Sequence, residues 1–223
     1  HADLTHLAHE RVEMEWQKLF LRGKHPSVGL ALAKETGVHD KLFPTVTHCP
    51  ISYTALDLAA STTRPMFALE SPGRAYALML SLWLNKTNVG LITQTLASLK
   101  LQRHAKYPLD KKVTEAVTQK NAPITTDKDL RWLSTRCELL LTLTMRFHLG
   151  DKDAQQALEQ AEVLHILTEK PAPLLMGRAL RTLPISAGPQ MGKLLKQVYA
   201  LQLDGVVQNQ DQAFQKAKEL LAQ

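Results

Sequence analysis

The sequence predicts an all-α fold, an elongated array of packed helices joined by short loops. Three observations favour this class. Apolar residues recur at helical spacing wherever a pattern is present, and no segment shows a convincing strand pattern. Glycine is scarce, with 10 in 223 residues, and runs of β-branched residues are short. Prolines and glycines divide the chain into segments of helix length, which suits an array of packed helices.

The N-terminal part of the chain is predicted to form two helices. Apolar residues at i, i+4, i+7 and i+8 indicate the buried face of the first: Val12, Trp16, Leu19 and Phe20. A second helix is expected to begin near Pro26, with Leu30 and Ala33 facing inward. Gly37 is expected to end it, because glycine readily takes the left-handed conformation that caps a helix. Residues 44–54 contain two prolines and are expected to form a loop.

Turn-forming residues bound the further predicted helices, which cover residues 74–85, 90–103, 110–119, 127–149, 153–170 and 189–203, with a last one from about 211. Thr126 or Asp127 is expected to cap the helix over 127–149. The carboxylates Asp127 and Asp129 are interpreted as charges at that helix N-terminus, which the helix dipole favours. Asp204 and Gly205 are expected to end the helix over 189–203.

The composition indicates an ordinary globular protein. Apolar residues make up 44% of the chain and charged residues 22%. No stretch approaches the roughly 20 apolar residues that a membrane span needs, so no membrane partner is expected. Cys49 and Cys137 are the two cysteines, too few for a disulfide scaffold and not spaced as a CxxC metal pair. The chain opens with His1 and no signal-like segment, so we expect a piece of a longer protein in the cytoplasm, with an organellar location left open.

Positive charge is concentrated in one segment. Lys and Arg exceed Asp and Glu by six over the whole chain. Residues 100–112 contain five of these cations and one carboxylate, a local net charge of +4: Lys100, Arg103, Lys106, Lys111 and Lys112 against Asp110. Such a patch attracts nucleic-acid phosphates by releasing their condensed counterions. The alternative interpretation is a solvated helix end with no partner.

The residues that carry catalytic chemistry are missing. The sequence has no P-loop, GxGxxG, HExxH, GxSxG or EF-hand pattern. Asp3, His6 and His9 would share one helix face, but His-x-x-His is a common chance pattern. Trp16 and Trp83 are expected in the core and not as platforms for stacked bases. The chain is therefore expected to bind and, by itself, to have no catalytic residues.

Two segments carry a more specific signal. Residues 10–20 read ERVEMEWQKLF, and residues 24–44 read KHPSVGLALAKETGVHDKLFP. They resemble the RNA-binding region of bacterial class II tRNA nucleotidyltransferases and related poly(A) polymerases, with its ER(I/V)xxE helix followed by PSxGLxxLxETG. Residues 185–214 are similar to the tail signature of that family, GPxxGxxL followed by DGxxxN; the matching residues are Gly188, Pro189, Gly192, Leu195, Asp204, Gly205, Asn209 and Ala213.

The resemblance implies a division into three parts: the end of the neck with RNA-binding helices (1–48), a helical body (49–183) and a helical tail (184–223). Many family members have an HDxGK metal motif in the middle, where this chain reads LDLAASTT over residues 56–63. The body is therefore expected to be a degenerate HD-like region without phosphohydrolase activity. The catalytic head, with its GSxxR loop and paired aspartates, does not occur in this sequence.

The resemblance further implies that body and tail hold the acceptor and TψC arms of tRNA while the head adds C, C and A to the 3′ end. The parent enzyme would use Mg²⁺ with CTP and ATP, and this chain would hold no cofactor. Double-stranded RNA is bound mainly through its shape and phosphates, which suits lysines, arginines and helix N-termini. The candidate RNA-binding residues are Lys24, Arg103, Lys106, Lys111, Lys112, Gly188, Lys193 and Lys196. For Gly188, Pro189 and Gly192, the alternative is that they only shape a tight helix entry and allow close packing.

Three other interpretations stay open at this point. The first is a poly(A) polymerase parent, since the RNA-binding helices are shared within the family. The second is a headless, non-catalytic component of a larger ribonucleoprotein, which the basic pI of about 9.3 and the degenerate middle also fit. The third interpretation is a helical protein-interaction module in which the basic patch has no RNA partner.

Overall fold

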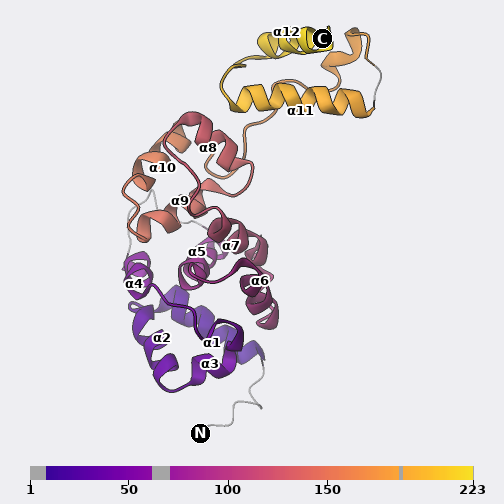
Figure 1. The fold of residues 1–223 in the computed structure, drawn as a ribbon. Coiled ribbons are helices and arrows are strands. Elements are labelled where there is room, and N and C mark those ends of the chain that lie inside the picture. Colours follow the sequence, from indigo (N-terminus) through magenta and orange to yellow (C-terminus); the bar gives the residue numbers. More distant parts are fainter. Residues whose placement is uncertain (1–8, 62–70, 186–187, 223) are drawn as a thin grey trace.

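The computed structural model describes residues 9–61, 71–185 and 188–222, and it confirms an all-α array of packed helices. Figure 1 shows an elongated molecule in which the helices follow one another from the N-terminal end to a separate C-terminal pair. The first part contains α1 (His9–Arg22), α2 (Pro26–Glu35), α3 (Val38–Leu42), the 3₁₀ turn η1 (Pro44–Val46) and α4 (Tyr53–Ser61). The sequence patterns did not predict α3 and α4, which are 5 and 9 residues long.

The middle of the molecule is formed by α5 (Pro72–Leu84), α6 (Val89–Ser98), α7 (Leu109–Thr118), α8 (Asp127–Ser134), α9 (Leu139–His148) and α10 (Ala154–Val163). A small antiparallel hairpin, β1 (Arg103–His104) and β2 (Tyr107–Pro108), lies between α6 and α7. The tail consists of the 3₁₀ turn η3 (Ala179–Thr182), α11 (Pro189–Leu203) and α12 (Gln210–Leu221).

Three hydrophobic clusters succeed one another along the chain, which accounts for the elongated shape. The first contains residues from the elements α1 through α7, together with Leu141 and Met145 of α9. The second lies among α8, α9 and α10, and the third lies within the tail. The first cluster brings together residues from 12 to 149, whereas the second and third are confined to residues 122–167 and 174–220. The helices therefore do not all close around one core.

The N-terminal helices follow the predicted pattern. Trp16 is buried and stacks on Phe43 with ring centroids 5.0 Å apart, and it meets Trp83 edge-on at 6.2 Å. Both tryptophans therefore belong to the core, as predicted. Pro26 occupies the first turn of α2, and Gly37 follows that helix with a φ of 72°, in the left-handed region that glycine favours.

Three predicted helices are shorter than their sequence patterns suggested. The helix expected over 127–149 is two helices, because the chain turns between Ser134 and Leu139. There the hydroxyls of Ser134 and Thr135 donate hydrogen bonds back to the carbonyls of Arg131 and Trp132. The helix expected over 90–103 ends at Ser98, and the one expected over 153–170 ends at Val163. After both, the chain takes a left-handed conformation, at Lys100 (φ 55°) and at His165 (φ 55°).

The helix ends that depend on local hydrogen bonds were predicted well. Thr126 caps α8 in a reciprocal capping box with Asp129, whose carboxylate accepts hydrogen bonds from the Thr126 backbone and hydroxyl. Helix α11 spans Pro189–Leu203 and is followed by Asp204 and by Gly205, which has a φ of 80°. These cases confirm Asp129 as a charge at a helix N-terminus and Asp204–Gly205 as a helix end.

Candidate nucleic-acid interface

The basic segment 100–112 forms the β1–β2 hairpin and the first turn of α7. His104 pairs with Tyr107, so Ala105 and Lys106 make a two-residue turn at the tip. Both have positive φ, 47° and 68°, which is the backbone of the hairpin turn that normally holds Asn-Gly. A side chain in this conformation costs about 1 kcal/mol per residue. Tertiary contacts must therefore hold the hairpin in place.

Helix α5 supplies the first of these contacts. A Cβ atom added to Gly73 would lie 2.5 Å from the carbonyl oxygen of His104 and still closer to the Cβ of Tyr107. Only glycine fits this close approach of hairpin and helix. The His104 ring also meets the Tyr76 ring edge-on at 5.4 Å, and its Nε2 lies 3.1 Å from the side-chain nitrogen of Gln17 on α1.

Glu138 fixes the hairpin from the other side. This carboxylate is buried and accepts a hydrogen bond of 2.9 Å from the Tyr107 hydroxyl and one from Arg74 Nε. The Arg74 guanidinium also lies over the Tyr107 ring, 5.6 Å from its centroid. Burial and the nearby Glu138 charge raise the pKa of Tyr107, so its hydroxyl remains a donor at neutral pH. Arg74, Tyr107 and Glu138 come from three different elements, α5, β2 and the turn before α9.

The five cations of the segment differ in how far they are free to meet a phosphate. Lys100, Arg103 and Lys106 are exposed and have no carboxylate within ion-pair distance in the described part of the chain. Lys111 is exposed, with its Nζ 3.9 Å from Glu115. Lys112 is mostly buried, and its Nζ lies 3.4 Å from Glu115 and 3.8 Å from Glu138. The structure therefore places Lys112 in an intramolecular carboxylate cluster, and the available charge lies on the hairpin and in the turn just before it.

The tail presents Gly188, Lys193 and Lys196 at the start of α11. Gly188 precedes the helix with an extended backbone, and both lysines are exposed. Added Cβ atoms at Gly188 and Gly192 would meet no heavy atom within 4 Å among the described residues. Close packing against the described residues therefore does not account for these two glycines, while Gly188 and Pro189 do form the entry to α11, the other part of the alternative interpretation. Lys193 borders a depression of about 340 Å³ beside Leu221 of α12.

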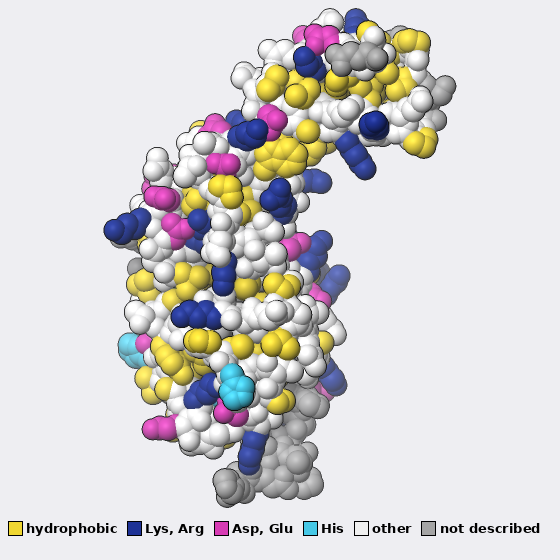
Figure 2. Space-filling model, in the orientation of Figure 1, with side chains coloured by type: hydrophobic (Ala, Val, Ile, Leu, Met, Phe, Trp, Pro, Cys, Tyr) yellow, Lys and Arg dark blue, Asp and Glu magenta, His cyan; other side chains and the backbone are white. Residues whose placement is uncertain are grey.

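Lys24 lies in the loop between α1 and α2 and is exposed. The hairpin packs on α5 and α7. Figure 1 shows that the end with α2, the middle with α5 and α7, and the tail follow one another along the molecule. The structure thus spreads the predicted RNA-binding residues over an extended surface and does not bring them into one site. Figure 2 shows Lys and Arg side chains around the concave angle between tail and body.

Sequence reasoning missed the residues that position the hairpin, Gly73, Arg74 and Glu138. Pro72 and Gly73 form a dipeptide that is typical of turns, so nothing in the sequence indicated a contact between Gly73 and the hairpin. Glu138 sat inside a helix that was predicted to be continuous. A lone carboxylate in the apolar run from Cys137 to Leu141 was the available signal, because buried carboxylates are usually paired.

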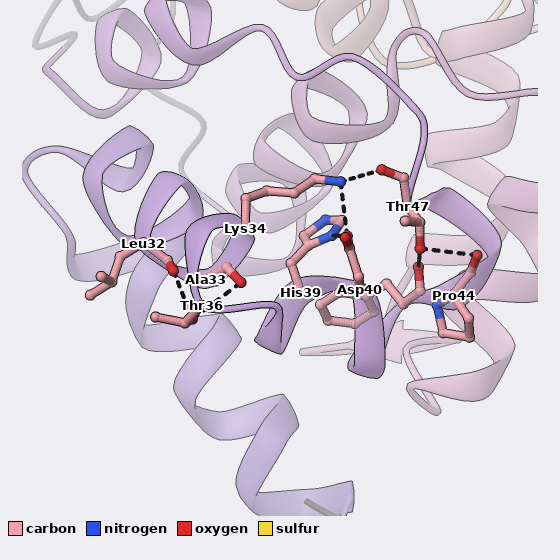
Figure 3. Close-up of polar contacts among 9 residues, drawn as sticks. Leu32, Ala33, Lys34, Thr36, His39, Asp40, Pro44 and Thr47 are labelled. Atoms are coloured by element: carbon pink, nitrogen blue, oxygen red, sulfur yellow. Dashed lines mark hydrogen bonds and ion pairs between the residues drawn. The ribbon is translucent and has the colours of Figure 1, made fainter. Parts of the chain in front are cut away.

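The residues around Glu35, Thr36 and Gly37, the ETG of the resemblance, have a structural role that Figure 3 shows in detail. Lys34 Nζ donates to Asp40 Oδ1 at 2.9 Å and to the carbonyl oxygen of Thr47, so it joins α2, α3 and η1. The hydrogen bond from Lys34 lowers the pKa of Asp40. His39 lies fully buried with its Nδ1 3.0 Å from Asp40, and burial lowers its pKa. Thr36 donates back to the Leu32 carbonyl at 2.8 Å and ends α2.

No metal centre is found in the described part of the chain, where no three His, Cys, Asp or Glu side chains converge. Of the candidate ligands near the N-terminus, Asp3, His6 and the side chain of His9 lie outside the described residues. Cys49 and Cys137 are free thiols, and burial raises the pKa of Cys137 to about 11, so it stays protonated. None of the described helices is both long and apolar enough to cross a bilayer.

Comparison with known proteins supports an RNA-binding role for the N-terminal segment. Residues 1–49 match a family model described as "Probable RNA and SrmB- binding site of polymerase A". The described part of this match is α1, α2, α3 and η1, the helices held together by Trp16, Lys34 and His39. No curated protein matches the chain, and no solved structure does. The N-terminal segment is thus similar to a poly(A) polymerase-type RNA-binding domain.

Proposed function

We propose that this chain is the RNA-binding body and tail of a tRNA nucleotidyltransferase, and that it holds tRNA while a separate head adds nucleotides to the 3′ end. The observation that carries the proposal is the match of residues 1–49 to the RNA-binding segment of polymerase A. A rigidly held basic hairpin and an exposed basic start of α11 supply phosphate contacts beyond that segment. The PSxGL and ETG residues of the N-terminal segment and the tail signature from Gly188 to Ala213 favour a tRNA-adding parent over a poly(A)-adding one.

The geometry suits binding that does not depend on sequence. Arg103 and Lys106 lie on a hairpin whose backbone is fixed by Gly73 and Glu138, so little backbone entropy is lost when they meet a phosphate. Lys100 lies in the turn just before the hairpin. Phosphate contacts position an RNA without reading its bases, as an enzyme that serves every tRNA requires. In the tail, Lys193 and Lys196 would contact a second stretch of backbone.

The nucleotidyl transfer itself belongs to the parent. Such a reaction needs Mg²⁺ ions that activate the 3′-hydroxyl and neutralise the triphosphate of CTP or ATP. The described residues of this chain do not fit such a site, because no three ligating side chains converge. We therefore assign no step of the transfer to this chain, which would act on the orientation of the RNA.

A second candidate function, docking of a protein on α2, is favoured by one observation. Val28 and Leu32 lie one turn apart on α2 and are 65% and 58% exposed, within the segment whose family description names SrmB beside RNA. Such a surface would also suit the headless ribonucleoprotein component. Replacing both residues by serine separates the two functions. Loss of a protein partner with unchanged tRNA binding would favour docking at this face.

The proposed function is tested by binding of the purified chain to tRNA and to duplex DNA over a salt series. We expect preferential tRNA binding that weakens steeply with salt. Replacing Lys100, Arg103 and Lys106 together by glutamine should reduce the slope of log K against log salt by about 2 to 3, since each lost phosphate contact contributes about 0.7 to 0.9. The matched control replaces Lys86, Lys152 and Lys170, three exposed lysines outside the hairpin. An absence of tRNA binding at low salt would refute the proposal.

A further inference from the structure

A pocket of about 450 Å³ lies where the tail meets the body, apart from every residue discussed so far as an RNA contact. Trp132 of α8 and Arg136 of the following turn form part of its wall, and Asp204 at the end of α11 closes it from the tail. Pro123 and Lys128 also line the pocket. Figure 2 shows hydrophobic surface at this junction with Lys and Arg side chains nearby.

Trp132 differs from the other two tryptophans of the chain. Trp16 and Trp83 are 7% and 2% exposed and pack against other rings, whereas Trp132 is only half-buried. Its indole N–H donates a hydrogen bond of 2.8 Å to Asp204, which fixes the plane of the ring. Within the described residues, no aromatic ring or cation packs on Trp132. A fixed aromatic face in a pocket is a platform for another flat ring.

Arg136 supplies the charge that is free in this pocket. Lys128 Nζ lies 3.0 Å from Asp204, and the Asp129 carboxylate accepts its hydrogen bonds from Thr125 and Thr126. Arg136 is exposed, and in the described part of the chain its guanidinium has no carboxylate within ion-pair distance. A guanidinium beside an aromatic ring suits a ligand with both a flat ring and an anionic group, since arginine pairs well with phosphate oxygens.

We propose that this pocket binds one unpaired nucleotide of an RNA strand, with its base stacked on Trp132 and its phosphate on Arg136. The inference rests on the proposed function, because it names a further RNA contact of the same chain. Stacking on an aromatic side chain tolerates any base and contributes about 1–3 kcal/mol per base. A base within a duplex is already stacked on both faces and cannot enter the pocket. The ligand would bridge α8 and the end of α11, and so hold the tail against the body.

Tryptophan fluorescence tests the inference directly. The full chain is titrated with a single-stranded RNA hexamer, with a duplex of the same RNA, and with inorganic phosphate. We expect the hexamer to quench the emission of Trp132, because Trp132 lines this pocket, whereas Trp16 and Trp83 are buried in the core. The duplex and inorganic phosphate should leave this emission unchanged. Replacement of Trp132 by phenylalanine should abolish the quenching, while a phenyl ring still allows the hexamer to bind.

Arg136→Gln is the decisive variant, because it leaves the hydrogen bond between Trp132 and Asp204 intact. We expect it to weaken hexamer binding about tenfold, the effect of losing one charge-assisted hydrogen bond. Lys86→Gln is the matched control, since Lys86 is an exposed cation between α5 and α6, outside residues 1–49, the hairpin and the tail. Trp132→Leu should weaken binding of the hexamer by at least the same factor, because the stacking surface is lost.

The outcomes separate this inference from the proposed function. The pocket inference is wrong, and the proposed function stands, if tRNA binds but the hexamer does not quench Trp132. The same conclusion follows if Arg136→Gln binds the hexamer as well as Lys86→Gln does. If the hexamer quenches Trp132 in the expected way but tRNA is not bound, the pocket stands as a nucleotide site and the proposed function fails. If neither RNA binds, both are overturned.

Discussion

The indole N–H of Trp132 donates a hydrogen bond of 2.8 Å to the carboxylate of Asp204, 72 residues further along the chain. Lys128 lies 3.0 Å from the same carboxylate, and the side chain of Arg131 approaches Gly205. Through this small junction the tail, which has its own hydrophobic cluster, is attached to the body. The Asp-Gly pair that resembles a family signature therefore has a structural role at the base of the tail.

Replacement of Asp204 by alanine is expected to loosen the tail. The hydrogen bonds from Trp132 and Lys128 lower the pKa of Asp204, and their loss should cost about 1–2 kcal/mol. Limited proteolysis should then cut the connection between α10 and α11 faster than in the native chain. Glu162→Ala, an exposed carboxylate of α10 with no such contacts in the described part of the chain, is the control. Equal cleavage rates for the two variants would show that the junction does not hold the tail.

The same junction predicts a dependence on acid. The pKa of Asp204 in the folded chain lies below its ordinary value. The stability that Asp204 gives to the junction between tail and body is therefore fully present at a pH above the ordinary carboxyl range. That contribution is lost as the pH falls through the folded pKa. Cleavage of the native chain should therefore stay slow at neutral pH and approach that of the alanine variant only in strong acid.

Gly73→Ala is expected to displace the hairpin. The new methyl group would overlap the His104 carbonyl and Tyr107, and overpacking of this kind costs about 1–3 kcal/mol. Thermal unfolding should show the lower stability, and the folded variant should bind tRNA with a smaller salt dependence because Arg103 and Lys106 have moved. Gly90→Ala serves as the control, because its added Cβ would lie 3.5 Å from Asn88, an ordinary contact. Normal stability of Gly73→Ala would contradict the close approach.

Gly192→Ala distinguishes the two interpretations of the tail glycines. An added Cβ meets nothing within 4 Å in the described structure, and alanine favours a helix over glycine by about 0.5–1 kcal/mol. The variant should therefore be more stable to denaturant than the native chain. If RNA backbone approaches α11 closely at this point, tRNA affinity should fall at the same time. Unchanged affinity with raised stability would exclude a close RNA contact at Gly192.

Because of His148, the free energy of unfolding is expected to decrease as the pH is lowered from 6.5 to 4. Burial lowers its pKa from 6.5 to about 4, so in this window the unfolded chain binds a proton that the folded chain excludes. The resulting loss is on the order of 3 kcal/mol at the acid end of the window. The buried His39, whose pKa is also lowered, acts in the same direction. Denaturant unfolding at several pH values measures the slope, and His148→Leu should flatten it if the variant folds.

Local sequence determined the helix ends that a few neighbouring residues control. Thr126 with Asp129, Gly37, and Pro189 with Asp204 all have the predicted roles, because a cap is made by hydrogen bonds within one turn. The buried face of α1 could also be read from its spacing, since Trp16 and Phe20 are both buried. The basic character of residues 100–112 and the RNA-binding resemblance of the N-terminal segment likewise needed no structure.

Only the tertiary structure decided which cations are free and what holds them. Glu138 pairs with Arg74 and Tyr107, which lie 64 and 31 residues away, so no local pattern could place it between α8 and α9. The same contacts offset the strained hairpin turn at Ala105 and Lys106, where local preference favours neither residue. The pocket beside Trp132 likewise exists because Asp204 returns to α8. Helix caps are made within one turn of the chain, whereas buried charges and pockets need partners from distant parts of it.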